Sequence, residues 1–190
     1  LLIINLSSML HLNFHPFPEL KTGRLLLRRM TANDSPEVYF LRSDEQVLEF
    51  IGKEPAANED AVKEFIKNIN LDVDANQAIM WGIALQENPS ILIGNICYWR
   101  IQSQHHRAEI GYTLHPGYWR KGIMKEAVLK VMEFGFDEMK LHSIEARISS
   151  GNLASAAILK STGFVQEGYL KEEFCFRNKF YDTIIFSKLK

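Results

Sequence analysis

The stretch RAEIGYTLHPGYWRKGIMKEA, residues 107–127, joins a β-rich run to an amphipathic run through a loop that contains glycine. A helix that begins just after Gly122 would present its first free backbone N–H groups above its N-terminus. Together with the helix dipole, these groups form an anion site. Arg120, Lys121 and Lys125 add positive charge beside it. The stretch therefore predicts a site for a pyrophosphate.

The loop matches no standard nucleotide motif. It has neither the Walker spacing nor GxGxxG, which excludes a P-loop hydrolase or a dinucleotide-binding domain by motif. One glycine between basic residues before a helix is also common in proteins that bind no phosphate. The order of elements around the loop has to support the prediction.

Upstream of this stretch the chain predicts one strand, two helices and a hairpin. Residues 24–30 have strand composition, and Asn33 or Asp34 is expected to cap a helix with Pro36 in its first turn. Apolar residues recur at helical spacing across 58–73. The β-rich runs 78–86 and 91–101 flank the turn signal ENPS and predict a hairpin.

Downstream, residues 142–148 predict a strand and residues 152–163 a compact helix, with Asn152 as N-cap and Gly163 as its stop. Two further β runs follow, 164–174 and 179–188. The order is strand, two helices, three strands, helix, strand, helix and two strands. It predicts an α+β (mixed α/β) fold, one sheet with helices on both faces.

Length and composition place the chain among ordinary globular proteins. Its 190 residues suit one domain, and a net charge of −1 argues against broad capture of nucleic acid. The two cysteines, Cys97 and Cys175, form no CxxC pair, His115 and His142 have no metal-like spacing to partners, and no metal is expected. A reducing cytoplasm is the expected setting.

The N-terminal ten residues are apolar, but they lack a positively charged start and are too short to span a bilayer. No other run approaches a membrane span, and no membrane partner is expected. Met9 offers a natural start, and whether residues 1–8 are native stays open. We expect an N-terminal extension over residues 1–16 and one domain over 17–190.

Two segments together point to a family. The stretch AEIGYTLHPGYWRKGIMKEAV (108–128) is followed by NLASAAILKSTGFVQEG (152–168), and the pair resembles the GCN5-related N-acetyltransferases (GNAT). RLLLRRMTANDSPEVYFLRSDEQV (24–47) and NKFYD (178–182) are similar to the Rim-type branch, which acetylates ribosomal-protein N-termini. The resemblance covers roughly residues 17–190 and implies a mostly antiparallel sheet of about seven strands.

The resemblance implies acetyl-CoA as cosubstrate. Backbone groups of Tyr112, Thr113 and Leu114 would bind its pantetheine arm, with Asn152 as a further contact. The family's pyrophosphate loop, usually Q/R-x-x-G-x-G/A, corresponds to residues 119–124, with Trp and Met at the first and last positions. The residues expected around the pyrophosphate are Arg120, Lys121, Gly122, Ile123, Met124 and Lys125.

The resemblance further implies direct attack of an amine on the thioester in a ternary complex. Glu109 matches a frequent general base of the family. In a regular strand it shares a face with Gly111 and Thr113, although GNAT strands at this place usually carry a bulge. Ser155 is expected to protonate the leaving thiolate, with Tyr169 and Tyr181 as rival acids.

Three functions stay open at this level. The first is a Rim-type enzyme that acetylates a protein N-terminal amine, and the second an enzyme for small amines such as a polyamine, amino acid or antibiotic. The third is a non-catalytic module that binds acyl-CoA. The early helices and the final hairpin are expected to select the acceptor. The sequence does not distinguish a monomer from a homodimer.

Overall fold

An eight-stranded sheet in the order β1-β2-β3-β4-β5-β6-β8-β7 carries the chain. The computed structural model describes residues 9–190. Every neighbouring pair of strands is antiparallel except β5 and β6, which are parallel. The strands are β1 (Leu20–Lys21), β2 (Leu25–Arg28), β3 (Ile79–Leu85), β4 (Asn88–Gln102), β5 (Arg107–Leu114), β6 (Ser143–Ser149), β7 (Val165–Phe176) and β8 (Lys179–Leu189).

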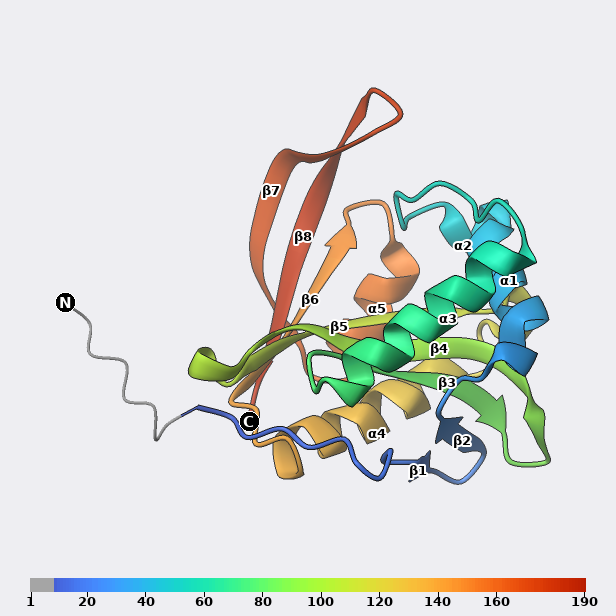
Figure 1. The fold of residues 1–190 in the computed structure, drawn as a ribbon. Helices are drawn as coiled ribbons and strands as arrows, with labels where there is room; N and C mark the ends of the chain where they lie inside the picture. The colour runs from blue at the N-terminus through green and yellow to red at the C-terminus, as the bar shows by residue number, and fades with distance from the viewer. Residues whose placement is uncertain (1–8) are drawn as a thin grey trace.

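Helices cover both faces of this sheet (Figure 1). The helices are α1 (Ser35–Ser43), α2 (Glu45–Leu48), α3 (Glu59–Asp74), α4 (Ile123–Asp137) and α5 (Leu153–Ser161). Helices α1 to α3 lie on one face and α4 on the other, while the β7–β8 hairpin extends beyond the rest of the sheet (Figure 1). The predicted mixed α/β fold with a mostly antiparallel sheet is confirmed.

The details differ from the sequence prediction in three places. The two-residue strand β1 makes eight strands instead of about seven, and the single turn α2 follows α1. The hairpin turn is Gln86–Glu87 rather than ENPS, because Leu85 pairs with Asn88. Pro89 is tolerated in β4 because the register between β3 and β4 is irregular next to it.

The N-terminal part of the described chain packs on the domain. Leu10 and Phe14 are buried in the core, and the Leu10 N–H donates to the Ser103 carbonyl at 3.1 Å. Residues 1–8 of the expected extension lie outside the described residues. Within 9–190, no helix is both long and apolar enough to cross a bilayer.

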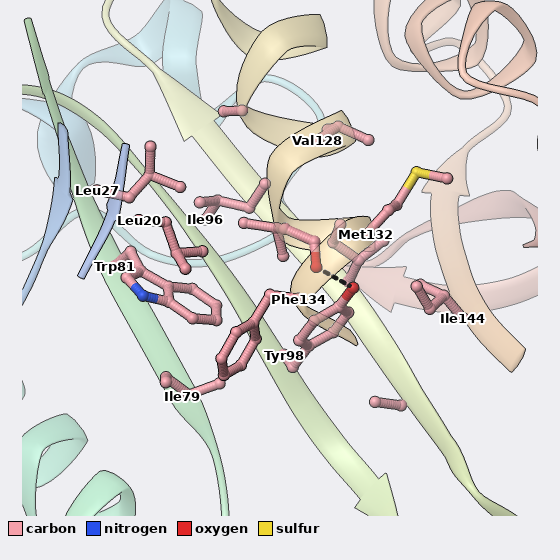
Figure 2. Packing of buried hydrophobic residues seen from close by; sticks show 14 of the residues in the cluster. Leu20, Leu27, Ile79, Trp81, Ile96, Tyr98, Val128, Met132, Phe134 and Ile144 are labelled. Carbon is pink, nitrogen blue, oxygen red and sulfur yellow. Dashed lines mark hydrogen bonds between the residues drawn. The ribbon is translucent and has the colours of Figure 1, made fainter. Parts of the chain in front are cut away.

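The main core lies between the sheet and α4. Trp81, Tyr98 and Phe134 pack edge to face there, with the Trp81 and Phe134 ring centroids 5.4 Å apart (Figure 2). The buried Tyr98 hydroxyl donates to the Val131 carbonyl of α4 at 3.0 Å. This contact fixes α4, and therefore its N-terminus, against the centre of the sheet.

We predict that Gly135→Ala destabilises the protein by about 1–3 kcal/mol, although alanine favours a helix. A Cβ at Gly135 would lie 2.5 Å from the Tyr98 hydroxyl oxygen, and that ring is fully buried. Urea denaturation measures the change. Gly23→Ala is the matched control, because a Cβ there meets nothing within 4 Å. Equal stability of the two variants would contradict this packing.

Candidate functional site

The parallel pairing of β5 with β6 is short. It joins Arg107–Glu109 to Ser143–Glu145 and ends there. β6 pairs with β8 on its other edge from Ser143 to Ser149, and the described residues provide no strand beside the second half of β5. The sheet therefore opens into a gap that starts at Glu109.

Main-chain groups of β5 face this gap. The His115 N–H donates to the Ile93 carbonyl of β4 at 2.8 Å, and hydrogen-bonding direction alternates along a strand. Tyr112 and Leu114 therefore direct their main-chain groups toward the gap, whereas those of Thr113 face β4. The Leu114 carbonyl accepts from the Trp119 indole N–H at 2.7 Å, which leaves the N–H groups of Tyr112 and Leu114 for a ligand.

The N-terminus of α4 lies at the far end of β5. Gly122 is its N-cap residue, and its φ of +73° is a left-handed conformation that favours glycine. The N–H groups of the first helical residues, Ile123, Met124 and Lys125, have no partner within the helix. The Ile123 and Met124 side chains are buried, so these two residues offer only backbone. Arg120, Lys121 and Lys125 are exposed around them.

Arg24 holds this turn, although the sequence analysis gave it no such role. Its Nη1 donates to the Lys121 carbonyl at 3.0 Å, and its Nε donates to the Glu126 carboxylate at 2.7 Å. Glu126 lies in the first turn of α4, and Arg24 compensates its charge there. The helix N-terminus thus keeps its attraction for an anion. No local pattern could have linked Arg24 to a residue 102 positions away.

A cavity of about 420 Å³ brings five of the predicted site residues together. Its lining includes Glu109, Tyr112, Thr113, Asn152 and Ser155. Leu114 and residues 120–125 do not line it and lie further along β5 and at α4. The predicted residues therefore form two parts, a basic helix N-terminus and a cavity with a carboxylate, joined by β5.

Glu109 is a buried carboxylate, with 7% of its surface exposed. Burial raises its pKa; the Arg100 guanidinium opposes this rise, with Nη1 at 3.1 Å from Oε2. Oε1 has no hydrogen-bond partner within residues 9–190. The pairing of β5 with β4 is regular from Leu114 to Glu109, so the bulge considered for this strand is absent. It lies in β4 instead, between Trp99 and Gln102.

Asn152 caps α5, as the sequence predicted. Its Oδ1 accepts from the Ser155 N–H at 3.0 Å, which leaves the amide nitrogen for another partner. The buried Tyr112 Oη and Thr113 Oγ1 have no hydrogen-bond partner in the described chain. Burial raises the pKa of Tyr112 to about 12, and the Ser155 hydroxyl nearby opposes this rise. The two hydroxyl groups do not have the geometry of a hydrogen bond. These orphaned polar atoms indicate a site for a polar ligand.

The two rival tyrosines lie elsewhere. The Tyr169 hydroxyl donates to the Asp182 carboxylate within the hairpin, and this bond raises the pKa of Tyr169. Tyr181 lines a second cavity of about 410 Å³, between α2, the segment after it and the β7–β8 hairpin. Neither tyrosine lines the cavity that holds Glu109.

The second cavity adjoins the first, since Leu48, Phe50 and Lys53 line both. Aromatic rings dominate the hairpin side, and an ion pair between Arg177 Nη2 and Glu54 Oε2 at 2.5 Å ties the hairpin to the segment after α2. The sequence analysis missed this cavity because its walls come from distant segments. Among residues 9–190, no group of three or more His, Cys, Asp or Glu side chains is placed to hold a metal.

Comparisons with known proteins agree with this architecture. A family model described as an acetyltransferase (GNAT) domain matches residues 24–165. The uncharacterized N-acetyltransferase YoaA of Bacillus subtilis is 32% identical over 92% of this chain and 98% of that protein. A spermidine N(1)-acetyltransferase of Vibrio cholerae is 23% identical over 85% of this chain and 90% of that protein.

Among solved structures, a ribosomal-protein-S5-alanine acetyltransferase from Vibrio fischeri superposes with a TM-score of 0.80. Its identity is 25%, over 90% of this chain and 96% of the other. The match of the family model over most of the chain, together with the relative from B. subtilis, confirms the predicted family. The chain therefore belongs to the GNAT acetyltransferase family and is an N-acetyltransferase.

Proposed function

We propose that the protein transfers the acetyl group of acetyl-CoA directly to a protein N-terminal amine, with Glu109 as the general base. The observation that carries this proposal is the cavity that joins Glu109 to the orphaned hydroxyls of Tyr112 and Thr113 and to the α5 cap. A buried carboxylate with one free oxygen is suited to accept a proton from an amine.

The residues present fit acetyl-CoA. The free N–H groups at the start of α4, with Arg120, Lys121 and Lys125, would hold the pyrophosphate. The gap-facing N–H groups of β5 and the Asn152 amide nitrogen would hold the pantetheine arm. Trp119 and Met124 depart from the family's loop, but backbone groups supply most of this site. Acetyl-CoA brings the activated acyl group.

Each catalytic need has a residue in the cavity. Glu109 takes a proton from the amine, and burial, which raises its pKa, makes it a stronger base than an exposed glutamate. A backbone N–H at the gap stabilises the oxyanion. Ser155 donates a proton to the departing sulfur, and Tyr112, whose pKa of about 12 keeps it protonated at neutral pH, lies nearby.

The charge of the cavity supports a singly charged acceptor. Its lining contains three cations, Arg42, Lys53 and Arg147, and three carboxylates, Glu54, Asp72 and Glu109. A polyamine carries several positive charges and favours a site with a surplus of carboxylates. An N-terminal amine carries one, and the second cavity leaves room for the residues that follow it. The relative that is named for ribosomal protein S5 supports a Rim-type acceptor.

A polyamine remains the second candidate. Asp44, Glu45 and Glu49 cluster at α2, and the spermidine acetyltransferase of Vibrio cholerae is a relative. Asp44 caps α2 by accepting from the Val47 N–H, which leaves Glu45 and Glu49 at the second cavity. Arg177 shares this lining but pairs with Glu54, and Lys53 lines both cavities, so the two cavities together hold four cations and five carboxylates. A surplus of one carboxylate is small for a polyamine, which favours the peptide acceptor.

We predict that Glu109→Gln lowers kcat by about a hundredfold or more, because glutamine cannot accept the proton. Binding of CoA, measured by calorimetry, should stay unchanged. The assay measures thiol release with peptides that carry a free N-terminus and, separately, with spermidine. Unchanged turnover would refute Glu109 as the base. Faster turnover of spermidine than of any peptide would refute the acceptor, and bound CoA without turnover of any amine would favour the non-catalytic module.

We predict that Asn152→Asp and Asn152→Ala separate the two roles of this side chain. Asn152→Ala should lose about 1 kcal/mol of unfolding free energy with the cap, whereas Asn152→Asp keeps it. Both should weaken CoA binding about fivefold, because both lose the amide donor. Urea denaturation and calorimetry measure these effects. Wild-type affinity in Asn152→Asp would limit Asn152 to the cap.

A further inference from the structure

The bulge in β4 places an arginine beside Glu109. Trp99 pairs with Glu109 and Gln102 with Arg107, so three residue steps of β4 oppose two of β5. Arg100, within the bulge, has a φ of +46°. In a regular strand Arg100 would point away from the face that Trp99 and Glu109 share. The bulge cancels this alternation.

Two contacts show the result. The Arg100 guanidinium lies over the Trp99 ring, 4.3 Å from its centroid, and Nη1 lies 3.1 Å from Glu109 Oε2. Arg100 does not line the cavity, whereas Trp99 and Glu109 do. Arg100 therefore contacts Glu109 without lining the cavity, and it leaves Oε1 without a hydrogen-bond partner in the described chain.

The other arginines near Glu109 pair with other carboxylates. Arg107 and Arg147 both pair with Glu145, and Arg147 also pairs with Glu173. The groups that surround Glu109 are Arg100 and the Cys97 thiol on β4, Glu145 and Arg147 on β6, and Lys53 across the cavity. Burial raises the pKa of Cys97 to about 12, so the thiol is neutral. Within residues 9–190, Arg100 is the direct ion partner of Glu109.

We infer that Arg100 is a positioning residue for acetyl transfer: it anchors Oε2 of Glu109 so that the ionised Oε1 faces the acceptor amine. The inference rests on the proposed role of Glu109 as base. Arg100 acts through Glu109 and touches no reacting atom. The bulge in β4 makes this contact possible, since in a regular strand the guanidinium would start from the opposite face.

Burial and the Arg100 guanidinium act on the pKa of Glu109 in opposite directions. Burial raises the pKa of Glu109, and Arg100 lowers it. Removal of the guanidinium therefore raises the pKa further, and the carboxylate becomes protonated at a higher pH. Activity that depends on the ionised Glu109 carboxylate is then lost at a higher pH in the variant than in the wild type.

The test compares Arg100→Gln and Arg100→Lys with the wild type by thiol release across pH. Both variants keep a side chain at the same positive φ, so the backbone strain is matched. We expect Arg100→Gln to lower kcat about tenfold at about pH 6 and to approach the wild-type kcat at about pH 9. Its KM for acetyl-CoA should be unchanged. Arg100→Lys should restore most of the loss.

Arg29→Gln is the control, because Arg29 pairs with Asp74 at 2.7 Å and neither residue lines the cavity. It should keep the wild-type pH profile. A carbon-13 NMR titration of the Glu109 carboxyl tests the effect of Arg100 without turnover. The titration midpoint should rise in Arg100→Gln and stay near the wild-type value in Arg100→Lys.

Two results would overturn the inference. One is a pH profile and a Glu109 midpoint in Arg100→Gln that superpose on the wild type. The other is a loss of kcat that is equal at every pH and accompanied by a lower melting temperature, which would mark a structural role. Failure of the proposed function looks different, because the wild type would then release no thiol or Glu109→Gln would keep full activity.

Discussion

The parallel pairing of β5 with β6 ends at Glu109, and the site depends on that ending. A ladder that continued would satisfy the N–H groups of Tyr112 and Leu114 and fill the space beside them. Because β6 pairs with β5 only as far as Glu145 and continues to Ser149 paired with β8 alone, these groups face a gap instead. The same divergence makes room for the cavity beside Glu109, so the proposed base and the proposed cofactor groove share one cause.

The remaining elements fix what borders this gap. The Tyr98 hydroxyl holds α4 against the sheet, and Arg24 ties the loop before α4 to its first turn. These contacts aim the helix N-terminus along β5 without using the N–H groups that an anion needs. The proposed acceptor side is built separately, from α2, the segment after it and the β7–β8 hairpin. This division allows acceptor selection to vary while the cofactor side stays the same.

Much of the fold could be predicted from the sequence, because its signals are local. The alternation of β5, the Asn152 cap and the glycine before α4 each depend on residues within a few positions of one another. The site residues on those elements, from Glu109 to Ser155, followed from the family's motifs. The structure groups five of them in one cavity, but their catalytic roles stay proposals.

The sequence could not predict the long-range contacts. Arg24 with Glu126 and Arg177 with Glu54 join residues more than a hundred positions apart. The bulge at Arg100 has no glycine to mark it in the sequence, and it is visible only in the register between β4 and β5. Arg100 consequently looked like any exposed strand arginine until the pairing was known.

The most direct test of the account is amide hydrogen exchange measured by NMR with and without saturating CoA. The N–H groups of Tyr112 and Leu114, and those of Ile123 to Lys125, should exchange more slowly when CoA is bound. The Thr113 N–H, which faces β4, should change little. Exchange at Tyr112 and Leu114 that stays the same under saturation would contradict the claim that the gap beyond Glu109 receives the cofactor.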